Sequence, residues 1–188
     1  MSVVCAVLAA GASRRLGRPK QLVAMDGRPL VRHVVERVRS QAFSALAVVV
    51  GAHAREVEAA LDGARVAIVA NDAWDEGVGS SIRAAVKWAR RERADALAIV
   101  LADQPRVDAA HLERLVDAWR EGSPIAASAY GGTRGAPAVF DASTFDALAS
   151  LEGDRGAARV VRAERRAAAV DWPEGAIDID TPDDYASY

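Results

Sequence analysis

Short apolar runs alternate with stretches of helical periodicity through the first 120 residues, and this alternation restricts the possible folds more than any other feature. The runs have the length and valine content of buried strands, whereas the intervening apolar residues recur every three or four positions, as in amphipathic helices. We expect strands at residues 3–8, 45–50, 66–70 and 96–102. We expect helices at residues 29–38, 56–61, 81–91 and 109–120, with Asp108 as the cap of the last one. Because parallel strands need crossover connections, this order predicts a mostly parallel sheet with helices on both faces.

The pattern changes after Ser123. Residues 125–129 and 138–140 flank a glycine-rich stretch and predict a hairpin or an irregular pair of strands. We then expect short helices at 142–151 and 156–164, a strand at 167–170 and a terminal helix after Thr181. Since no repeat, low-complexity tract or linker interrupts the sequence, we expect one α/β domain over residues 1–188, with three α/β/α layers around a mixed, mostly parallel sheet.

Charge, cysteine and histidine content argue against several classes of function. The 24 Lys and Arg residues face 26 Asp and Glu residues, and the net charge of −2 provides no basic excess for a nucleic acid backbone. Cys5 cannot form an internal disulfide, and three scattered histidines, His33, His53 and His111, do not resemble a zinc site. No apolar stretch approaches the roughly 18 residues of a membrane-spanning helix. We therefore expect a cytoplasmic protein that binds neither nucleic acid nor membranes.

The first predicted strand leads into a small, basic loop at the sheet edge where open parallel sheets bind ligands. Residues 8–20 combine small residues and two glycines with four basic side chains, Arg14, Arg15, Arg18 and Lys20. Backbone amides in such a loop can approach an anion closely. Gly11 and Gly17 match neither a P-loop nor a dinucleotide fingerprint. The alternative is a flexible basic surface loop.

Two acidic segments could complete a site at this edge. Asp103 directly follows the most apolar predicted strand, where a carboxylate is costly unless it is solvated, paired or bound to a metal. Asp178 and Asp180 alternate with isoleucine, so they share one face of an extended segment. Separated carboxylates beside a basic glycine loop suit a Mg²⁺–triphosphate site. Alternatively, Asp103 only forms a turn or caps a helix.

These segments resemble the signatures of the MobA-like nucleotidyltransferases, and they follow that family's order. Residues 8–20 match the pattern L-A-A-G-x-S-x-R-x-G-x-x-K, residues 103–105 match D-Q-P, and residues 178–182 match D-I-D-T-P. Asn71 with residues 77–81, and residues 153–156, add further matches, so the resemblance covers essentially the full chain. Ala10 is typical of the molybdenum cofactor cytidylyltransferase branch, since guanylyl enzymes usually have glycine there. We expect its methyl group to occupy space where the loop approaches the nucleotide, so that a pyrimidine fits better than a purine. Residues 134–137 read R-G-A-P where that branch often has R-G-H-P.

The resemblance implies a Rossmann-like nucleotidyltransferase fold with a divalent metal. The backbone of residues 8–11, which are Leu8, Ala9, Ala10 and Gly11, would hold the base and ribose. Arg15 and Lys20 would hold the triphosphate, and Asp103 and Asp180 would hold Mg²⁺. Arg15, Lys20 and Asp103 are the catalytic residues that it implies.

Other matched residues have two interpretations each. Asn71 either contacts the base or forms a turn. Ser80 and Ser81 either contact the nucleotide or cap the helix that they begin. A further group, Arg134, Asp154 and Arg155, either lines the acceptor side or provides surface charge.

The implied reaction transfers a nucleoside monophosphate from an NTP, preferably CTP, to the terminal phosphate of molybdopterin or molybdenum cofactor, and releases pyrophosphate. A molybdoenzyme or its maturation factor is the expected protein partner. The attacking phosphate oxygen is already anionic, so no general base is needed. Three alternatives stay open: a nucleotidyltransferase for a sugar or alditol phosphate, a MobA-like oxidoreductase, and a non-catalytic carrier of molybdenum cofactor. The presence of the whole basic loop and both acidic motifs favours catalysis.

Overall fold

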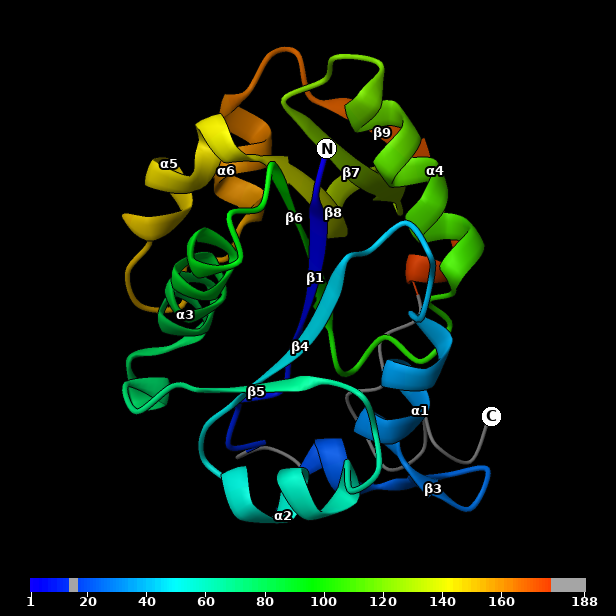
Figure 1. The fold of residues 1–188 in the computed structure, drawn as a ribbon, viewed down its shortest axis with the longest axis vertical. Coiled ribbons are helices and arrows are strands. Elements are labelled where there is room, and N and C mark those ends of the chain that lie inside the picture. The colour runs from blue at the N-terminus through cyan, green and yellow to red at the C-terminus, as the bar shows by residue number, and fades with distance from the viewer. Residues whose placement is uncertain (14–16, 177–188) are drawn as a thin grey trace.

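A mixed seven-stranded sheet forms the centre of the computed structural model, which describes residues 1–13 and 17–176 (Figure 1). The strand order is β5-β4-β1-β6-β8-β7-β9. Strand β8 runs antiparallel to both of its neighbours, whereas the other neighbouring pairs are parallel. The strands are β1 (Val3–Leu8), β4 (Ala45–Val50), β5 (Ala67–Ala70), β6 (Ala96–Leu101), β7 (Ile125–Tyr130), β8 (Thr133–Asp141) and β9 (Ala168–Asp171).

Helices cover both faces of this sheet, as the alternating sequence pattern predicted. In Figure 1, α3, α5 and α6 lie to the left of the strands and α1 and α4 to the right. The helices are α1 (Leu30–Arg37), α2 (Ala54–Ala60), α3 (Val78–Arg91), α4 (Ala109–Arg120), α5 (Phe145–Ala149) and α6 (Ala158–Ala163). The expected three-layer α/β/α architecture with a mostly parallel sheet is therefore confirmed.

Strand β1 illustrates why the central strands read as continuous apolar runs. All six of its residues are buried. Val3, Cys5 and Val7 face the core beneath α1 and α4, whereas Val4, Ala6 and Leu8 alternate toward the core beneath α3 and α5. Because both faces are covered, a polar residue within this strand would lose its hydration at either face.

Several local features differ from the expectations. Helix α3 begins at Val78, three residues before the expected start, and a short β2 (Ala24–Met25) and β3 (Arg28–Pro29) hairpin was not expected. Asp26 and Gly27 join these two strands with φ angles of 50° and 75°, so the Asp-Gly pair carried the turn signal. The cap expected at Asp108 is confirmed, since its carboxylate accepts from the His111 amide at 2.8 Å. The helix expected after Thr181 lies outside the described residues.

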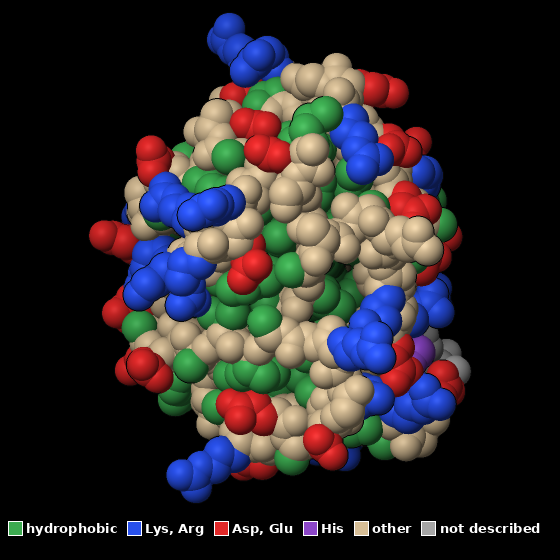
Figure 2. All heavy atoms as spheres, in the orientation of Figure 1, with side chains coloured by type: hydrophobic (Ala, Val, Ile, Leu, Met, Phe, Trp, Pro, Cys, Tyr) green, Lys and Arg blue, Asp and Glu red, His purple; other side chains and the backbone are tan. Residues whose placement is uncertain are grey.

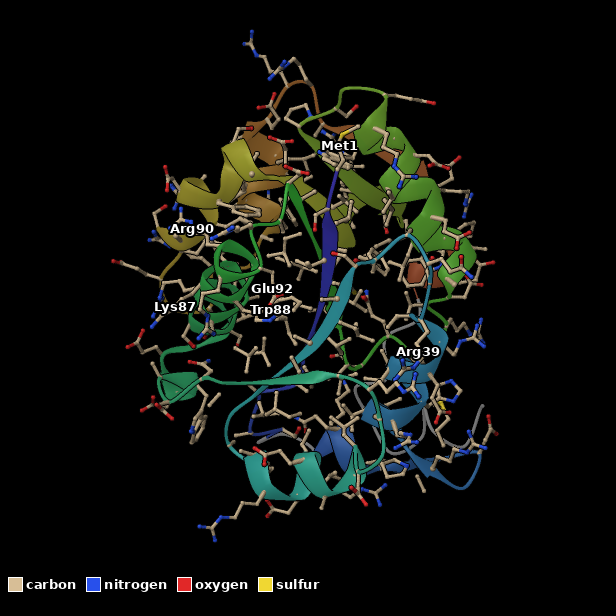
Figure 3. The ribbon with its side chains drawn as sticks, in the orientation of Figure 1. Met1, Arg39, Lys87, Trp88, Arg90 and Glu92 are labelled. Carbon is tan, nitrogen blue, oxygen red and sulfur yellow. The ribbon has the colours of Figure 1, made fainter. Side chains whose placement is uncertain are left out.

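Basic side chains gather on the outer surface of α3, seen at the left in Figure 2. Lys87 and Arg90 project outward from this helix in Figure 3. Arg83 and Arg90 form ion pairs with Glu76 and Asp146, which neutralises part of the positive charge. In residues 1–13 and 17–176, no helix is long and apolar enough to cross a membrane.

His111, in the first turn of α4, is buried in the core beside β7. Its side chain is 2% exposed, stacks on Trp172 at a centroid distance of 5.0 Å, and places Nε2 2.7 Å from Ser128 Oγ. The Ser128 hydroxyl donates to the Pro137 carbonyl at 2.6 Å, so it accepts from His111 Nε2–H. Burial, with the nearby charge of Arg114, lowers the pKa of His111 to about 4.

We expect this buried histidine to make folding stability depend on pH. The folded pKa lies below the ordinary value of 6.5, so the unfolded chain takes up the proton first as the pH falls. Stability is then full above about pH 6.5 and falls by about 2 kcal/mol on going to about pH 5. Urea unfolding at several pH values should show this loss in the wild type and a much smaller one in His111→Gln. A wild-type unfolding free energy that stays constant over this range would contradict the prediction.

Candidate functional site

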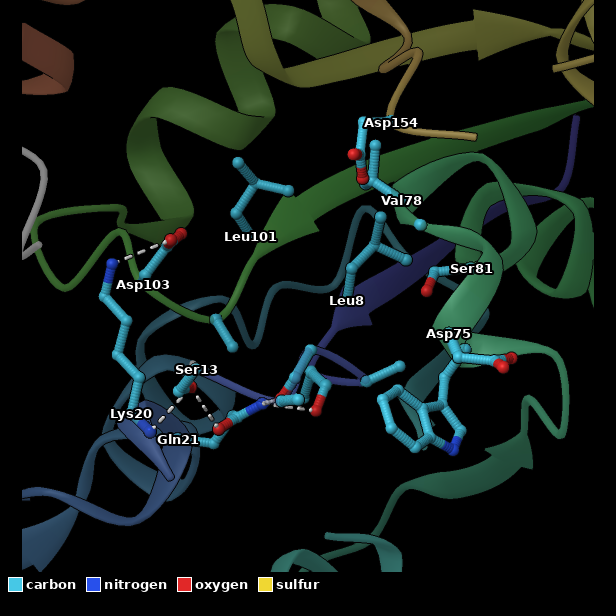
Figure 4. Close-up of a pocket in the computed structure, with 17 residues that line it drawn as sticks. Leu8, Ser13, Lys20, Gln21, Asp75, Val78, Ser81, Leu101, Asp103 and Asp154 are labelled. Carbon is cyan, nitrogen blue, oxygen red and sulfur yellow. Dashed lines mark hydrogen bonds and ion pairs between the residues drawn. The ribbon is translucent and has the colours of Figure 1, made fainter. Parts of the chain in front are cut away.

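A cavity of about 610 Å³ opens at the carboxyl ends of β1 and β6. Residues 9–13, which follow β1, form the floor of the cavity and are called the floor loop below. Lys20 and Asp103 lie on one side of the cavity, and the start of α3 lies on the other (Figure 4). Of the residues that the sequence selected, the cavity is lined by Leu8, Ala9, Ala10, Gly11, Lys20, Ser81, Asp103 and Asp154. Residues distant in the sequence thus meet at the edge where parallel sheets bind ligands.

The floor loop packs closely against the end of β4. The Ala9 amide donates to the Val49 carbonyl at 2.9 Å, and the Ala52 amide donates to the Ala10 carbonyl at 3.1 Å. Between these contacts, a Cβ on Gly51 would lie 2.7 Å from the Ala10 carbonyl oxygen and 2.8 Å from the Ala10 methyl carbon. Any larger residue at position 51 would displace the loop.

The Ala10 side chain was expected to narrow the base pocket and so to favour a pyrimidine. Its methyl group instead packs in the core beside Gly51, and the residue is only 3% exposed. This position does not support the idea that the Ala10 methyl group selects a pyrimidine over a purine by its size. Any selection of the base at this loop depends on backbone polar groups.

Gln21, which no sequence pattern indicated, contacts the floor loop on the side of the short helix η1 (Lys20–Leu22). It belongs to this helix, is 5% exposed, and donates from Nε2 to the Ala9 carbonyl at 2.8 Å and the Gly11 carbonyl at 2.6 Å. Its Oε1 accepts from Ser13 Oγ at 3.3 Å. Ser13 has a φ of 51°, an uncommon conformation for a residue other than glycine, and its Oγ also accepts from the Lys20 amide at 2.9 Å.

In the floor loop, the carbonyl groups of residues 9–11 are hydrogen-bonded, whereas several of the amide groups are not bonded to any described residue. The carbonyl oxygens of Ala9, Ala10 and Gly11 each accept at least one hydrogen bond. The amides of Ala10, Gly11 and Ala12 have no hydrogen-bond acceptor within the described ranges. Since all three residues line the cavity, the loop offers backbone donors there.

Lys20 and Asp103 form an ion pair at one side of the cavity, with Lys20 Nζ 3.1 Å from Asp103 Oδ2. The side chains are 14% and 35% exposed, so the pair is partly screened from water. Asp103 Oδ1 is buried and has no hydrogen-bond partner among the residues that the structure describes. A buried carboxylate oxygen in this state can accept a further ligand.

The opposite side is built by the start of α3 and the segment around Asp154. Gly77 precedes the helix with a φ of 106°, and a Cβ there would lie 2.6 Å from the Gly153 carbonyl carbon and 2.5 Å from Asp154 Oδ1. The Gly79 amide donates to the Gly153 carbonyl at 2.9 Å. These contacts place Asp154 at the same cavity as Lys20, and its role toward the acceptor stays a prediction.

Asn71, after β5, and Ser80, in the first turn of α3, are both buried, and their side chains contact each other. Asn71 Nδ2 donates to Ser80 Oγ at 2.9 Å and to Ser81 Oγ at 3.1 Å, and Ser80 Oγ donates to the Gly77 carbonyl at 2.8 Å. Ser81 lines the cavity. The observed contacts of Asn71 and Ser80 thus hold the start of α3, and their roles toward a nucleotide stay predictions.

A further predicted residue, Arg134, is described and does not line this cavity. Arg134, on β8, donates to the Ala167 carbonyl at 3.1 Å. Arg15, Asp178 and Asp180 lie outside the described residues.

Comparison with known proteins identifies relatives of this chain. The family model of the MobA-like NTP transferase domain matches residues 5–169. The Rv0371c protein of Mycobacterium tuberculosis H37Rv, solved as a complex with manganese, is 31% identical with a TM-score of 0.80, and the match covers 100% of this chain and 97% of that one. A nucleotidyl transferase from Methanothermobacter thermautotroptrophicus is 26% identical with a TM-score of 0.82, over 99% and 95% of the two chains.

Curated relatives match over a shorter region. The bifunctional protein GlmU of Burkholderia lata is 38% identical over 118 residues, which are 62% of this chain and 25% of that protein. The match thus spans about a quarter of that relative's length. The family match over most of the chain, together with the full-length structural likeness, shows that this protein belongs to the family of MobA-like NTP transferase domains.

Proposed function

We propose that this protein transfers a nucleoside monophosphate from an NTP, preferably CTP, to the terminal phosphate of molybdopterin or molybdenum cofactor. The observation that carries the proposal is the Lys20–Asp103 pair beside a loop of backbone donors in one cavity. Family membership supports an NTP as the donor substrate. The acceptor rests on the resemblance of the motifs to the molybdenum cofactor cytidylyltransferase branch.

The residues present fit a divalent cation. Asp103 offers a buried carboxylate oxygen without a hydrogen-bond partner in the described part of the chain, and hard cations such as Mg²⁺ prefer such ligands. We propose Asp103 and Asp180 as the residues that would hold Mg²⁺. The manganese complex of the Rv0371c protein supports a divalent metal in a relative. When bound, the cation would neutralise phosphate charge and help to align the reacting groups.

The reaction would join an oxygen of the acceptor phosphate to the α-phosphorus of the NTP. The bond between the α-phosphorus and the oxygen that bridges it to the β-phosphorus breaks, and pyrophosphate leaves with the bonding electrons. The attacking oxygen is anionic at neutral pH, so the protein does not need to remove a proton. Lys20 would offset the charge that develops on the phosphates, while the floor loop holds the base and fixes the distance of attack.

Pyrophosphate release tests the donor and the acceptor together. CTP, GTP, ATP and UTP should each be assayed with molybdopterin, molybdenum cofactor, a sugar phosphate and an alditol phosphate, in the presence of Mg²⁺. We expect release to be fastest with CTP and a molybdopterin-type acceptor. Equal or faster release with GTP would contradict the cytidylyl assignment. Pyrophosphate release with only the sugar phosphate or the alditol phosphate would contradict the proposed molybdopterin-type acceptor.

The oxidoreductase and carrier alternatives predict different results. An oxidoreductase would consume a reduced dinucleotide in the same preparations, whereas a carrier would bind molybdenum cofactor without releasing pyrophosphate. The molybdoenzyme or maturation-factor partner and the cytoplasmic location stay predictions.

A further inference from the structure

We infer that Gln21 is a positioning residue that sets the base preference of this site, and this inference rests on the proposed function. Gln21 occupies a buried position directly after Lys20, beneath the floor loop. Its single amide nitrogen donates to two carbonyl oxygens of that loop, those of Ala9 and Gly11, at 2.8 and 2.6 Å. The side chain therefore holds the loop at two points on either side of Ala10.

The chemistry of the side chain suits this position. A primary amide has two N–H donors and one carbonyl acceptor, and the contacts of Gln21 use both kinds of group. Ser13 donates to Oε1 at 3.3 Å, so the same side chain also contacts the residue with the unusual φ angle. Glutamate would place a carboxylate against two carbonyl oxygens, and methionine would leave both carbonyls without these donors.

The position of Gln21 determines which polar groups the loop offers to a base. The Gln21 side chain donates to the Ala9 and Gly11 carbonyls, and the Ala52 amide donates to the Ala10 carbonyl. The amides of Ala10, Gly11 and Ala12 then stay as donors at a cavity-lining loop. A loop of donors matches neighbouring acceptors on a base edge.

Cytosine and uracil differ in this respect. Cytosine offers O2 and N3 as neighbouring acceptors, whereas uracil replaces the N3 acceptor with an N–H donor. Against the floor loop, that donor would face another donor, and such an unpaired group costs about a tenfold loss in binding or more. Without the Gln21 amide, the Ala9 and Gly11 carbonyls are free to accept a hydrogen bond from the N3–H of uracil. The floor loop then no longer favours cytosine over uracil.

A purely structural role for Gln21 would have a different signature. Loss of the side chain would then shift Lys20 or lower stability, and CTP and UTP would weaken together because they carry the same triphosphate. The ratio of the two dissociation constants separates base selection from triphosphate binding. This ratio can be measured without knowing the acceptor.

The experiment is equilibrium titration of CTP and UTP, each with Mg²⁺, into wild type, Gln21→Met and Gln21→Glu. The exposed Gln41, which does not line the cavity, provides the matched control Gln41→Met. Circular dichroism checks that each variant is folded, and Gln21→Glu, which keeps the length of the side chain, replaces Gln21→Met if the latter does not fold. We expect wild type and Gln41→Met to bind CTP about tenfold or more tightly than UTP. In the Gln21 variants, this ratio should fall to about threefold or less.

Two outcomes would overturn the inference alone: a wild type that binds both nucleotides equally, and folded Gln21 variants that keep the wild-type ratio even with weaker binding. Failure of the wild type to bind any of the four common NTPs would overturn the proposed function and this inference together.

Discussion

Replacing Asp103 with alanine should slow nucleotide transfer by two orders of magnitude or more, about 3 kcal/mol of transition-state stabilisation. Asp103 carries both the contact to Lys20 and the buried oxygen available to a cation. The variant removes a metal ligand and leaves Lys20 without this carboxylate partner. The fold should survive, because Asp103 lies at the rim of the cavity and its side chain is 35% exposed. Steady-state pyrophosphate release with saturating Mg²⁺, together with a thermal melt, measures both effects.

The exposed Asp62 provides a matched control for this substitution. Asp62→Ala should retain normal turnover, since this residue lies outside the cavity. If Asp180 is the second metal ligand, Asp180→Ala should match Asp103→Ala, and Asp178→Ala should do less harm. Near-normal turnover in a folded Asp103→Ala protein would remove this carboxylate from the proposed mechanism.

Lys20→Ala should also cause a severe loss, of about one to two orders of magnitude in kcat/KM. The ammonium group lies 3.1 Å from Asp103 and lines the cavity. Removing it would take away a positive charge that offsets the phosphates and would leave Asp103 with less compensation. Lys20→Arg should restore activity only in part, because the guanidinium group is larger and planar. Pyrophosphate release against NTP concentration gives the two kinetic constants.

The sequence contains one other lysine, Lys87, which lies on the outer surface of α3 (Figure 3). Lys87→Ala is therefore the natural control, and we expect it to behave like wild type. Full activity in Lys20→Ala would favour the carrier alternative, which has no need of a phosphate-binding cation.

The central strands could be predicted because they are covered on both faces. In β1 and β6, nearly every position must be apolar, and this requirement appears directly as a run of valine, leucine, isoleucine and alanine. Asp103 stood out for the same reason, since a carboxylate follows the most buried run. The meeting of Lys20 and Asp103 could then be expected from the rule that strand ends share one edge of the sheet.

The contacts of Gln21 and Asn71 could not be predicted, since they depend on how loops fold back. Nothing in the sequence around Gln21 shows that its amide lies beneath residues 9–11 and not in solvent. Asn71 follows β5 and was expected either to contact the base or to form a turn. Its Oδ1 accepts from the Ala73 amide at 3.2 Å, as in a turn, and its Nδ2 also donates to two serines in the first turns of α3, which was not expected. The six-residue gap between Asn71 and Val78 allows many arrangements, and the packing of α3 on the sheet selects one of them.

The first residue of α3 depends on the conformation of the preceding glycine, Gly77. Ser80 and Ser81 looked like helix starts because serine is a common cap. Gly77 adopts a φ of 106° instead, in close contact with Gly153, and this packing lets the helix begin at Val78. The controlling contact lies 76 residues away in the sequence, which puts it beyond any local pattern.

The most direct test of the proposed function is to follow the α-phosphate of the nucleotide itself. CTP labelled with ³²P at the α-position should be incubated with the protein, Mg²⁺ and molybdenum cofactor, and the products separated. We predict that the label appears in the acceptor product in an amount equal to the pyrophosphate released, and that both depend on the acceptor. Label that stays in CTP while molybdenum cofactor binds would contradict nucleotide transfer.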